Sequence, residues 1–145
     1  MDKANAFNEY FINVCASVPR QAVDNLAQIM PNNSMDEMLF SEDSVLSKLN
    51  KLKTNTSPGP DLIHPKILYE MRDIVSPYLC NIFQQSLIQG YLPTDWKSSS
   101  VTVIHKKGKR DYVGNYRPIS LTSICCKIVE SIIKDNIVYY FKSNR

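Results

Sequence analysis

Cations gather in one short stretch of the sequence, where they could bind phosphate groups. Lys106, Lys107, Lys109, Arg110 and Arg117 lie within 12 residues of one another. Lysine offers an anion a compact point charge, and arginine can hold two phosphate oxygens at once. The chemistry that these residue types favour is therefore the binding of a polyanion.

The net charge of the chain also differs between its N-terminal and C-terminal parts. Residues 1–96 hold 7 Lys/Arg and 11 Asp/Glu, a net charge of −4, and residues 97–145 hold 10 Lys/Arg and 3 Asp/Glu, a net charge of +7, which sum to +3. A basic half beside a mildly acidic one indicates a polyanion partner for the C-terminal part, although a merely solvated basic face gives the same pattern.

Groups that could bind a metal are scattered. The four cysteines form no CxxC pair and the two histidines lack the spacing of metal ligands, so we predict free thiols and no zinc site. The closest acid pairs are Asp36-Glu37 and Glu42-Asp43, and the second suits the first turn of a helix. The sequence therefore predicts no catalytic residue and no metal ligand.

Helices are predicted for most of the first half of the chain. Hydrophobic spacing indicates a helix over residues 4–14, interrupted at Pro19, and a second short helical piece over 21–30, followed by a loop at 31–34. Ser41 then has the position of an N-cap, and the apolar stripe behind it predicts a helix that reaches residue 52.

Proline and glycine mark the next boundaries. Residues 54–61 (TNTSPGPD) predict a stiff, shaped loop in which Gly59 can take a positive φ. Pro65 suits the first turn of a helix that runs to about Arg72, and Gly90 suits the end of another that spans residues 77–89. The inward-facing side chains expected on that second helix are Leu79, Ile82, Phe83, Ser86 and Leu87.

The last third of the chain predicts a hairpin and a long helix. Residues 100–105 alternate and are β-branched, which indicates a strand; residues 106–116 form a basic hairpin loop, and 119–121 a short returning strand. Trp96 is predicted to be a packing residue. An amphipathic helix follows over residues 126–141. The fold class is α+β, mainly α, and the hairpin needs helices or further sheet to lean on.

Four sequence strings stand in an order that matches a known family. They are SPGPD at 57–61, GYLPTDWK at 90–97, IHKKG at 104–108 and NYRPISL at 115–121, followed by Lys127 and Glu130. Together they resemble the fingers region of reverse transcriptases from non-LTR (LINE-type, jockey-like) retrotransposons, and FNEYF at 7–11 resembles a segment that often precedes it. The resemblance covers about residues 41–145 well and the first 40 loosely.

The resemblance implies a role for each cation of the hairpin. Lys106 matches the family's loop lysine and Arg117 its RPISL arginine, and both would bind the triphosphate of the incoming nucleotide. Lys107, Lys109 and Arg110 would contact the backbone of the nucleic acid, a role that does not depend on sequence and weakens with salt. No role is assigned to His105.

The resemblance also implies what this chain lacks. Residues 1–40 would be a helical lead-in segment and residues 41–145 a partial reverse transcriptase domain, with the palm and thumb absent. Because the family's Mg²⁺-binding aspartates belong to the palm, we expect the chain to be an inactive polymerase fragment with no cofactor of its own. In a full-length protein the partners would be an RNA template, a DNA primer, a deoxynucleoside triphosphate and Mg²⁺.

Two other functions stay open at this point. The chain could be a non-catalytic RNA- or DNA-binding remnant, or a helical protein-interaction fragment in which Ile128, Ile132, Tyr139 and Tyr140 form an uncovered apolar patch. We expect an intracellular protein without a membrane span, because no apolar run is long enough and the N-terminus lacks the apolar region of a secretory signal. Nuclear or cytoplasmic residence and the oligomeric state are left open.

Overall fold

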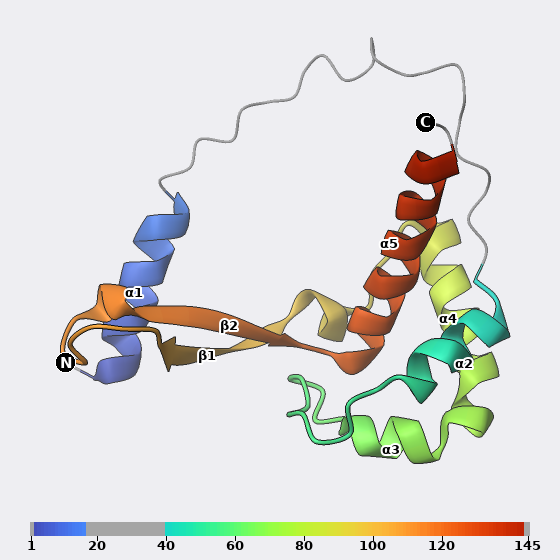
Figure 1. Cartoon of the computed structure of the whole chain (residues 1–145), viewed down its shortest axis with the longest axis horizontal. Coiled ribbons are helices and arrows are strands. Elements are labelled where there is room, and N and C mark those ends of the chain that lie inside the picture. Colours follow the sequence, from blue (N-terminus) through green and yellow to red (C-terminus); the bar gives the residue numbers. More distant parts are fainter. Residues whose placement is uncertain (1, 17–39, 144–145) are drawn as a thin grey trace, which may run out of the picture. The chain divides into compact units, whose positions relative to one another are not determined.

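The computed structural model describes residues 2–16 and 40–143, which belong to two compact units (Figure 1). Unit 1 contains helix α1 (Lys3–Ala16) and residues Val101–Ser120, and unit 2 contains residues 40–100 and 121–143. The helix predicted at 21–30 and the loop predicted at 31–34 lie outside the described residues, as does Pro19.

Unit 1 is built on a β-hairpin. Strand β1 (Ser99–His105) pairs with strand β2 (Tyr116–Thr122), and the short 3-10 helix η3 (Val113–Asn115) leads into β2. The first strand is confirmed, but the second begins three residues earlier than predicted. Pro118, which would break a central strand, is tolerated because a two-stranded sheet has only edge strands.

Helix α1 covers one face of this hairpin. The ring of Phe7 meets the ring of Tyr116 edge-on, with 4.8 Å between their centroids. A mostly apolar groove of about 480 Å³ runs between the helix and the strands. Its lining residues are Ala4, Phe7, Asn8, Phe11, Ile12, Val101, Val103, Pro118 and Ser120. The hairpin therefore packs against α1, which agrees with the prediction that it needs a supporting element.

Unit 2 begins with helix α2 (Glu42–Asn50), which has the N-cap that the sequence predicted. The Ser41 hydroxyl accepts a hydrogen bond from the Ser44 amide at 3.2 Å, and the Ser44 hydroxyl accepts one from the Ser41 amide at 3.3 Å. This reciprocal arrangement satisfies two amides that a helix start would otherwise leave without partners. Val45 and Leu49 then point into the core, with no exposed surface.

The next two helices differ from the prediction in their bounds. Helix α3 (Pro65–Glu70) is short, and α4 (Arg72–Gln89) begins five residues before Pro77. Pro77 is the sixth residue of α4, past the first turn, so it leaves the Asp73 carbonyl without the usual backbone donor of the helix. Gly90 ends α4 with φ of +60°, as predicted. On α4, Phe83 is fully buried, but Ile82 and Leu87 are exposed, so their predicted inward orientation is wrong.

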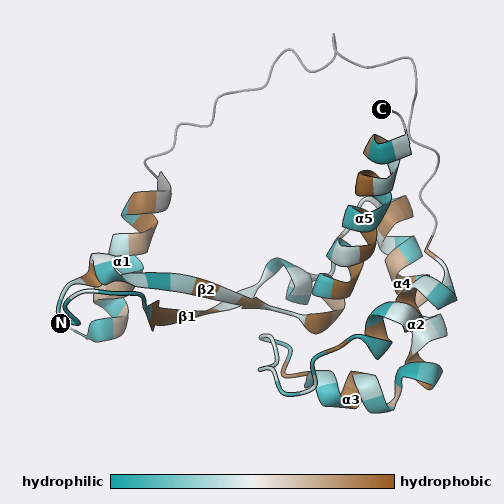
Figure 2. Ribbon diagram, in the orientation of Figure 1, coloured by the Kyte–Doolittle hydropathy of each residue, from teal (hydrophilic) through white to brown (hydrophobic). Residues whose placement is uncertain are grey.

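Helix α5 (Ile124–Ser143) closes the core of unit 2 against α2. Hydrophobic and hydrophilic residues alternate along it (Figure 2). Ile128 and Ile132 are each only 3% exposed, so their predicted place in an uncovered patch is wrong, whereas Tyr139 is 72% exposed.

Trp96, in the 3-10 helix η2 (Thr94–Lys97), packs edge-on against Phe83 at 5.6 Å, which confirms its packing role.

Gly59 is needed for a different reason from the predicted one. Its φ is not positive, since Gly90 and Gly108 are the glycines of the described chain that have such a φ. Instead, a Cβ on Gly59 would lie 2.6 Å from both the Ser123 nitrogen and the Thr122 oxygen. Gly59, between Pro58 and Pro60, thus packs directly on the backbone just before α5.

The described residues are mainly helical with one small antiparallel sheet, which confirms the α+β class. Cys80, Cys125 and Cys126 are free thiols, as predicted. No helix among the described residues is long and apolar enough to cross a membrane.

Candidate nucleic-acid interface

The basic loop, residues 106–111, follows β1 at the tip of the hairpin, and Tyr112 and η3 connect it to β2. It holds four cations and one acid, Asp111, and all of its side chains are exposed. Within residues 2–16 and 40–143, neither these four cations nor Arg117 forms an ion pair or a side-chain hydrogen bond. Their charges are therefore available to an anion from solution.

Side chains at the strand ends fix the path of the basic loop. The Nε2 of His105 lies 3.1 Å from the Gly108 carbonyl oxygen, the Asn115 side-chain amide donates to the Lys109 carbonyl at 2.7 Å, and the Tyr116 hydroxyl donates to the Arg110 carbonyl at 2.9 Å. Because a carbonyl oxygen can only accept, the His105 Nε2 must carry the proton. Three successive carbonyls are thus held by three side chains, which we call the carbonyl clamp.

Two further contacts support the carbonyl clamp. The His105 and Tyr116 rings meet edge-on at 5.1 Å, and the Lys106 amide donates to the Asn115 carbonyl at 2.7 Å, which continues the strand pairing by one residue. Gly108 has φ of +83°, and a Cβ there would lie 2.6 Å from the Asn115 Nδ2. The tight turn at Gly108 therefore needs glycine on both grounds.

Lys106 and Arg117 belong to the same face of the hairpin. Successive side chains of a strand point to opposite faces. Tyr116 and Pro118 face α1, since they contact Phe7 or line the groove beside it, so Arg117 between them faces the other way. Val103 also faces α1, which places His105 with it and directs Ile104 and Lys106 to the face of Arg117. The two residues predicted to bind a triphosphate are thus directed to one open face.

The sequence did not identify the carbonyl clamp. His105 was assigned no role, and Asn115 and Tyr116 appeared only as letters of a motif. Only the positions of these residues in the sequence could have indicated the clamp. Their side chains can donate hydrogen bonds, and they lie at the two ends of a loop whose carbonyls have no strand partner.

The described residues do not fit a metal. No group of three or more His, Cys, Asp or Glu side chains among residues 2–16 and 40–143 could hold a metal ion. Burial raises the pKa of the Cys125 thiol to about 11, and raises the pKa of Cys126 as well. Both thiols therefore stay protonated and weakly nucleophilic near neutral pH.

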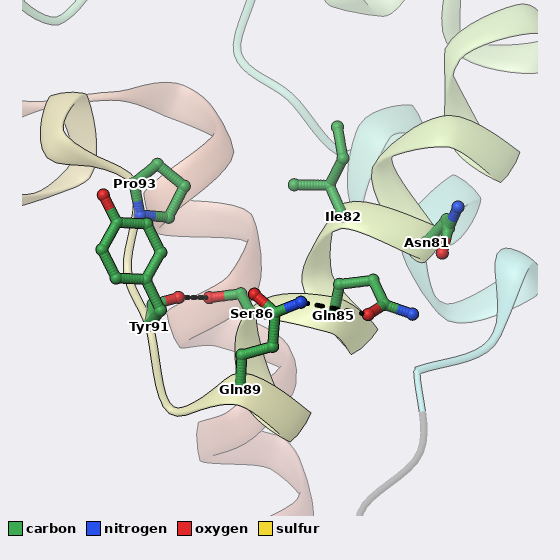
Figure 3. A pocket seen from close by; sticks show the side chains of 7 residues that line it. All are labelled: Asn81, Ile82, Gln85, Ser86, Gln89, Tyr91 and Pro93. Carbon is green, nitrogen blue, oxygen red and sulfur yellow. Dashed lines mark hydrogen bonds between the residues drawn. The ribbon is translucent and has the colours of Figure 1, made fainter.

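Unit 2 carries a separate small pocket of about 230 Å³ (Figure 3). The ring of Tyr91 lies beside Pro93 at one end, and the Tyr91 carbonyl accepts a hydrogen bond of 2.6 Å from the Ser86 hydroxyl. The Lys97 ammonium stands over the Tyr91 ring, 4.8 Å from its centroid. The remaining lining residues are Asn81, Ile82, Gln85 and Gln89. The pocket holds no acid or base placed for catalysis.

Comparison with known proteins shows which family the chain is related to. No family model matches the chain. The chain is 35% identical over 97 residues to the RNA-directed DNA polymerase from mobile element jockey of Drosophila melanogaster, a match that covers 66% of this chain and 11% of that protein. The predicted resemblance to non-LTR retrotransposon reverse transcriptases is confirmed, and the assignment to their fingers region stays a prediction. The chain is related in sequence to RNA-directed DNA polymerases of non-LTR retrotransposons.

Other relatives lead to the same family. The Pol polyprotein from type-1 retrotransposable element R1 of Bradysia coprophila is 30% identical over 93 residues, 63% of this chain and 9% of that protein. The probable RNA-directed DNA polymerase from transposon X-element of Drosophila melanogaster is 30% identical over 100 residues, 68% of this chain and 11% of that protein. The chain thus spans about a tenth of the length of these curated relatives.

Proposed function

We propose that this reverse-transcriptase-related chain is the fingers part of a retrotransposon polymerase, and that its basic loop binds the phosphates of nucleotide and nucleic acid. The observation that carries the proposal is the carbonyl clamp, which holds the backbone of a loop whose four cations form no ion pair within the described residues. Because these hydrogen bonds already order the loop backbone, little backbone freedom is lost on binding, which suits the loop to a dense anion.

The open face of the hairpin and the loop at its tip suit two kinds of phosphate. Lys106 and Arg117 share one open face, so a point charge and a planar guanidinium can meet the same triphosphate. Lys107, Lys109 and Arg110 extend from the loop itself and suit the spaced phosphates of a strand. The partners proposed in a longer protein are an RNA template, a DNA primer and a deoxynucleoside triphosphate.

Polymerisation requires groups that this sequence does not supply. Two divalent metals held by carboxylates activate the primer hydroxyl and stabilise the leaving pyrophosphate. The 145 residues contain no pair of adjacent aspartates. We therefore expect Mg²⁺ to belong to the full-length enzyme, and the isolated chain to give no magnesium-dependent primer extension on an RNA template. Product above the background of a protein-free reaction would refute this expectation.

The salt dependence of RNA binding tests the proposed function. Fluorescence anisotropy with a labelled single-stranded oligoribonucleotide would give the dissociation constant over a series of salt concentrations. Replacing Lys107, Lys109 and Arg110 together by alanine should reduce the slope of log affinity against log salt by about 2, because each phosphate contact in a single strand contributes about 0.7.

A matched control separates the loop from net charge. Lys66, Lys134 and Lys142 are exposed lysines of unit 2, and their joint replacement by alanine removes the same charge. This control should keep the wild-type slope. Equal losses of slope in the two triple variants would contradict a specific role for the basic loop, as would RNA binding that does not respond to salt.

The remnant that binds nucleic acid without catalysis has the same interface, and the measurement above supports it equally if the primer-extension result is negative. The helical interaction fragment has less support, because Ile128 and Ile132 are buried in unit 2 and cannot contribute to its patch.

A further inference from the structure

The carbonyl clamp has a consequence for the backbone of the basic loop. A trans peptide is planar, so its N–H points in the direction opposite to its C=O. The chain has no cis peptide among its described residues. The carbonyls of Gly108, Lys109 and Arg110 are each directed at a strand-end side chain. The amides of Lys109, Arg110 and Asp111 must therefore point away from those side chains.

These three amides have no partner within the described part of the protein. None of them donates a hydrogen bond to another group of residues 2–16 or 40–143. Residues 110 and 111 belong to a turn, and successive backbone N–H groups in a turn conformation can form a concavity that binds an anion. Lys107, Lys109 and Arg110 lie within a few residues of these amides in the sequence, and Asp111 is the one acid among them.

We propose that the amides of Lys109, Arg110 and Asp111 form a phosphate-binding backbone site, and that His105, Asn115 and Tyr116 are the positioning residues that present it. This inference rests on the proposed function and adds to it a backbone contribution that no substitution of the lysines or arginine would remove. The ligand is a phosphate group, which a nucleotide triphosphate or a nucleic-acid backbone can supply.

Tyr116→Phe tests the positioning role with little risk to the fold. The substitution deletes the hydroxyl that holds the Arg110 carbonyl but keeps the ring contacts with Phe7 and His105. Loss of one hydrogen bond should weaken phosphate binding about two- to tenfold. Tyr112→Phe is the matched control, because Tyr112 lies close in the same hairpin, is 62% exposed and forms no hydrogen bond through its hydroxyl in the described structure.

Titration of the ¹⁵N-labelled full chain gives the readout. Inorganic tripolyphosphate, a deoxynucleoside triphosphate and a short oligoribonucleotide would be added in separate experiments. We expect the amide signals of Lys109, Arg110 and Asp111 to shift in a saturable manner in at least one of them. The responding ligand identifies the source of the phosphate: the two small triphosphates indicate a nucleotide, and the oligoribonucleotide indicates a strand backbone.

The salt slope separates positioning from charge. Tyr116→Phe removes no cation, so it should lower affinity at fixed salt while leaving the slope of log affinity against log salt unchanged. Unchanged affinity in Tyr116→Phe, or amide signals that respond to none of the three ligands, would overturn the inference.

The two proposals can fail separately. RNA binding that depends on the loop cations without any shift of the three amides would leave the proposed function standing and reject the backbone site. A saturable response to tripolyphosphate alone, with no binding of nucleotide or RNA, would support the backbone site and reject the proposed function.

Discussion

Gly59 is constrained by the space around it and not by its own backbone angles. A Cβ at this position would lie 2.6 Å from backbone atoms of Thr122 and Ser123, which cannot move aside as a flexible side chain can. We predict that Gly59→Ala lowers the free energy of unfolding by about 2–3 kcal/mol, the cost of overpacking a close contact.

Gly90 provides the comparison within the same unit. Its φ is +60°, but a Cβ there would meet nothing within 4 Å. Gly90→Ala should therefore cost only the backbone strain of about 1 kcal/mol. Urea denaturation followed by circular dichroism measures both variants. A Gly59→Ala variant no less stable than Gly90→Ala would contradict the close packing of this loop on α5.

Cys125 should make the stability of unit 2 depend on alkaline pH. Burial, with a smaller contribution from the Asp61 carboxylate, raises the pKa of this thiol from 9.0 to about 11. Between these values the thiol ionises in the unfolded chain but not in the folded one, so the unfolded chain binds fewer protons and stability falls as pH rises. Below pH 9.0 the contribution is fully present.

Cys125→Ala isolates this effect from the lysines and tyrosines that also titrate there. The difference in unfolding free energy between wild type and Cys125→Ala should shrink by up to about 2 kcal/mol from about pH 8 to about pH 11. Urea denaturation at a series of pH values measures it. Two stability curves that stay parallel would show that the thiol does not titrate as described.

Single residues also show how far the sequence could identify the candidate site. The cations of the basic loop could be identified from the sequence, because the charge of a side chain follows from its residue type. The carbonyl clamp could not, because the partners of His105, Asn115 and Tyr116 are backbone carbonyls whose positions depend on how the loop folds. The reason for Gly59 was missed likewise, since it depends on residues more than 60 positions later.

At the level of elements, the N-cap of α2 is the feature that the sequence predicted best. Ser41→Ala removes the acceptor for the Ser44 amide and should lower stability by about 1 kcal/mol. Ser47→Ala, an exposed position of the same helix, should change stability by a few tenths of a kcal/mol at most, about the difference in helix propensity. Equal effects in thermal unfolding would argue against the cap.

The predicted starts of α4 and β2 are wrong, because proline does not mark the start of either element. Pro77 lies inside α4 and Pro118 inside β2, so both elements begin earlier than the sequence indicated. The missing amide of Pro118 costs little because it lies on an edge strand, whereas Pro77 removes one backbone hydrogen bond inside α4. Long apolar periodicity was more reliable, and α5 extends only two residues beyond its predicted bounds at each end.

At the level of the whole molecule, the order of predicted helices and strands was enough to predict the fold class. It was not enough to predict which face of each helix is buried. Ile128 and Ile132 were expected on an uncovered face of α5, yet they are buried in unit 2. Periodicity shows that a helix has an apolar stripe but not which neighbour covers it. The domain boundary predicted at residue 40 stays a prediction, as do the roles of Lys106 and Arg117.

The most direct test of the account is to map where RNA contacts the chain. An oligoribonucleotide that contains 4-thiouridine would be crosslinked to the full chain at low and at high salt, and the crosslinked peptides identified by mass spectrometry. We predict crosslinks within residues 106–117 that disappear at high salt, because the basic loop binds phosphates through charge. Crosslinks confined to unit 2, for example around Tyr91, would contradict the assignment of the hairpin as the nucleic-acid interface.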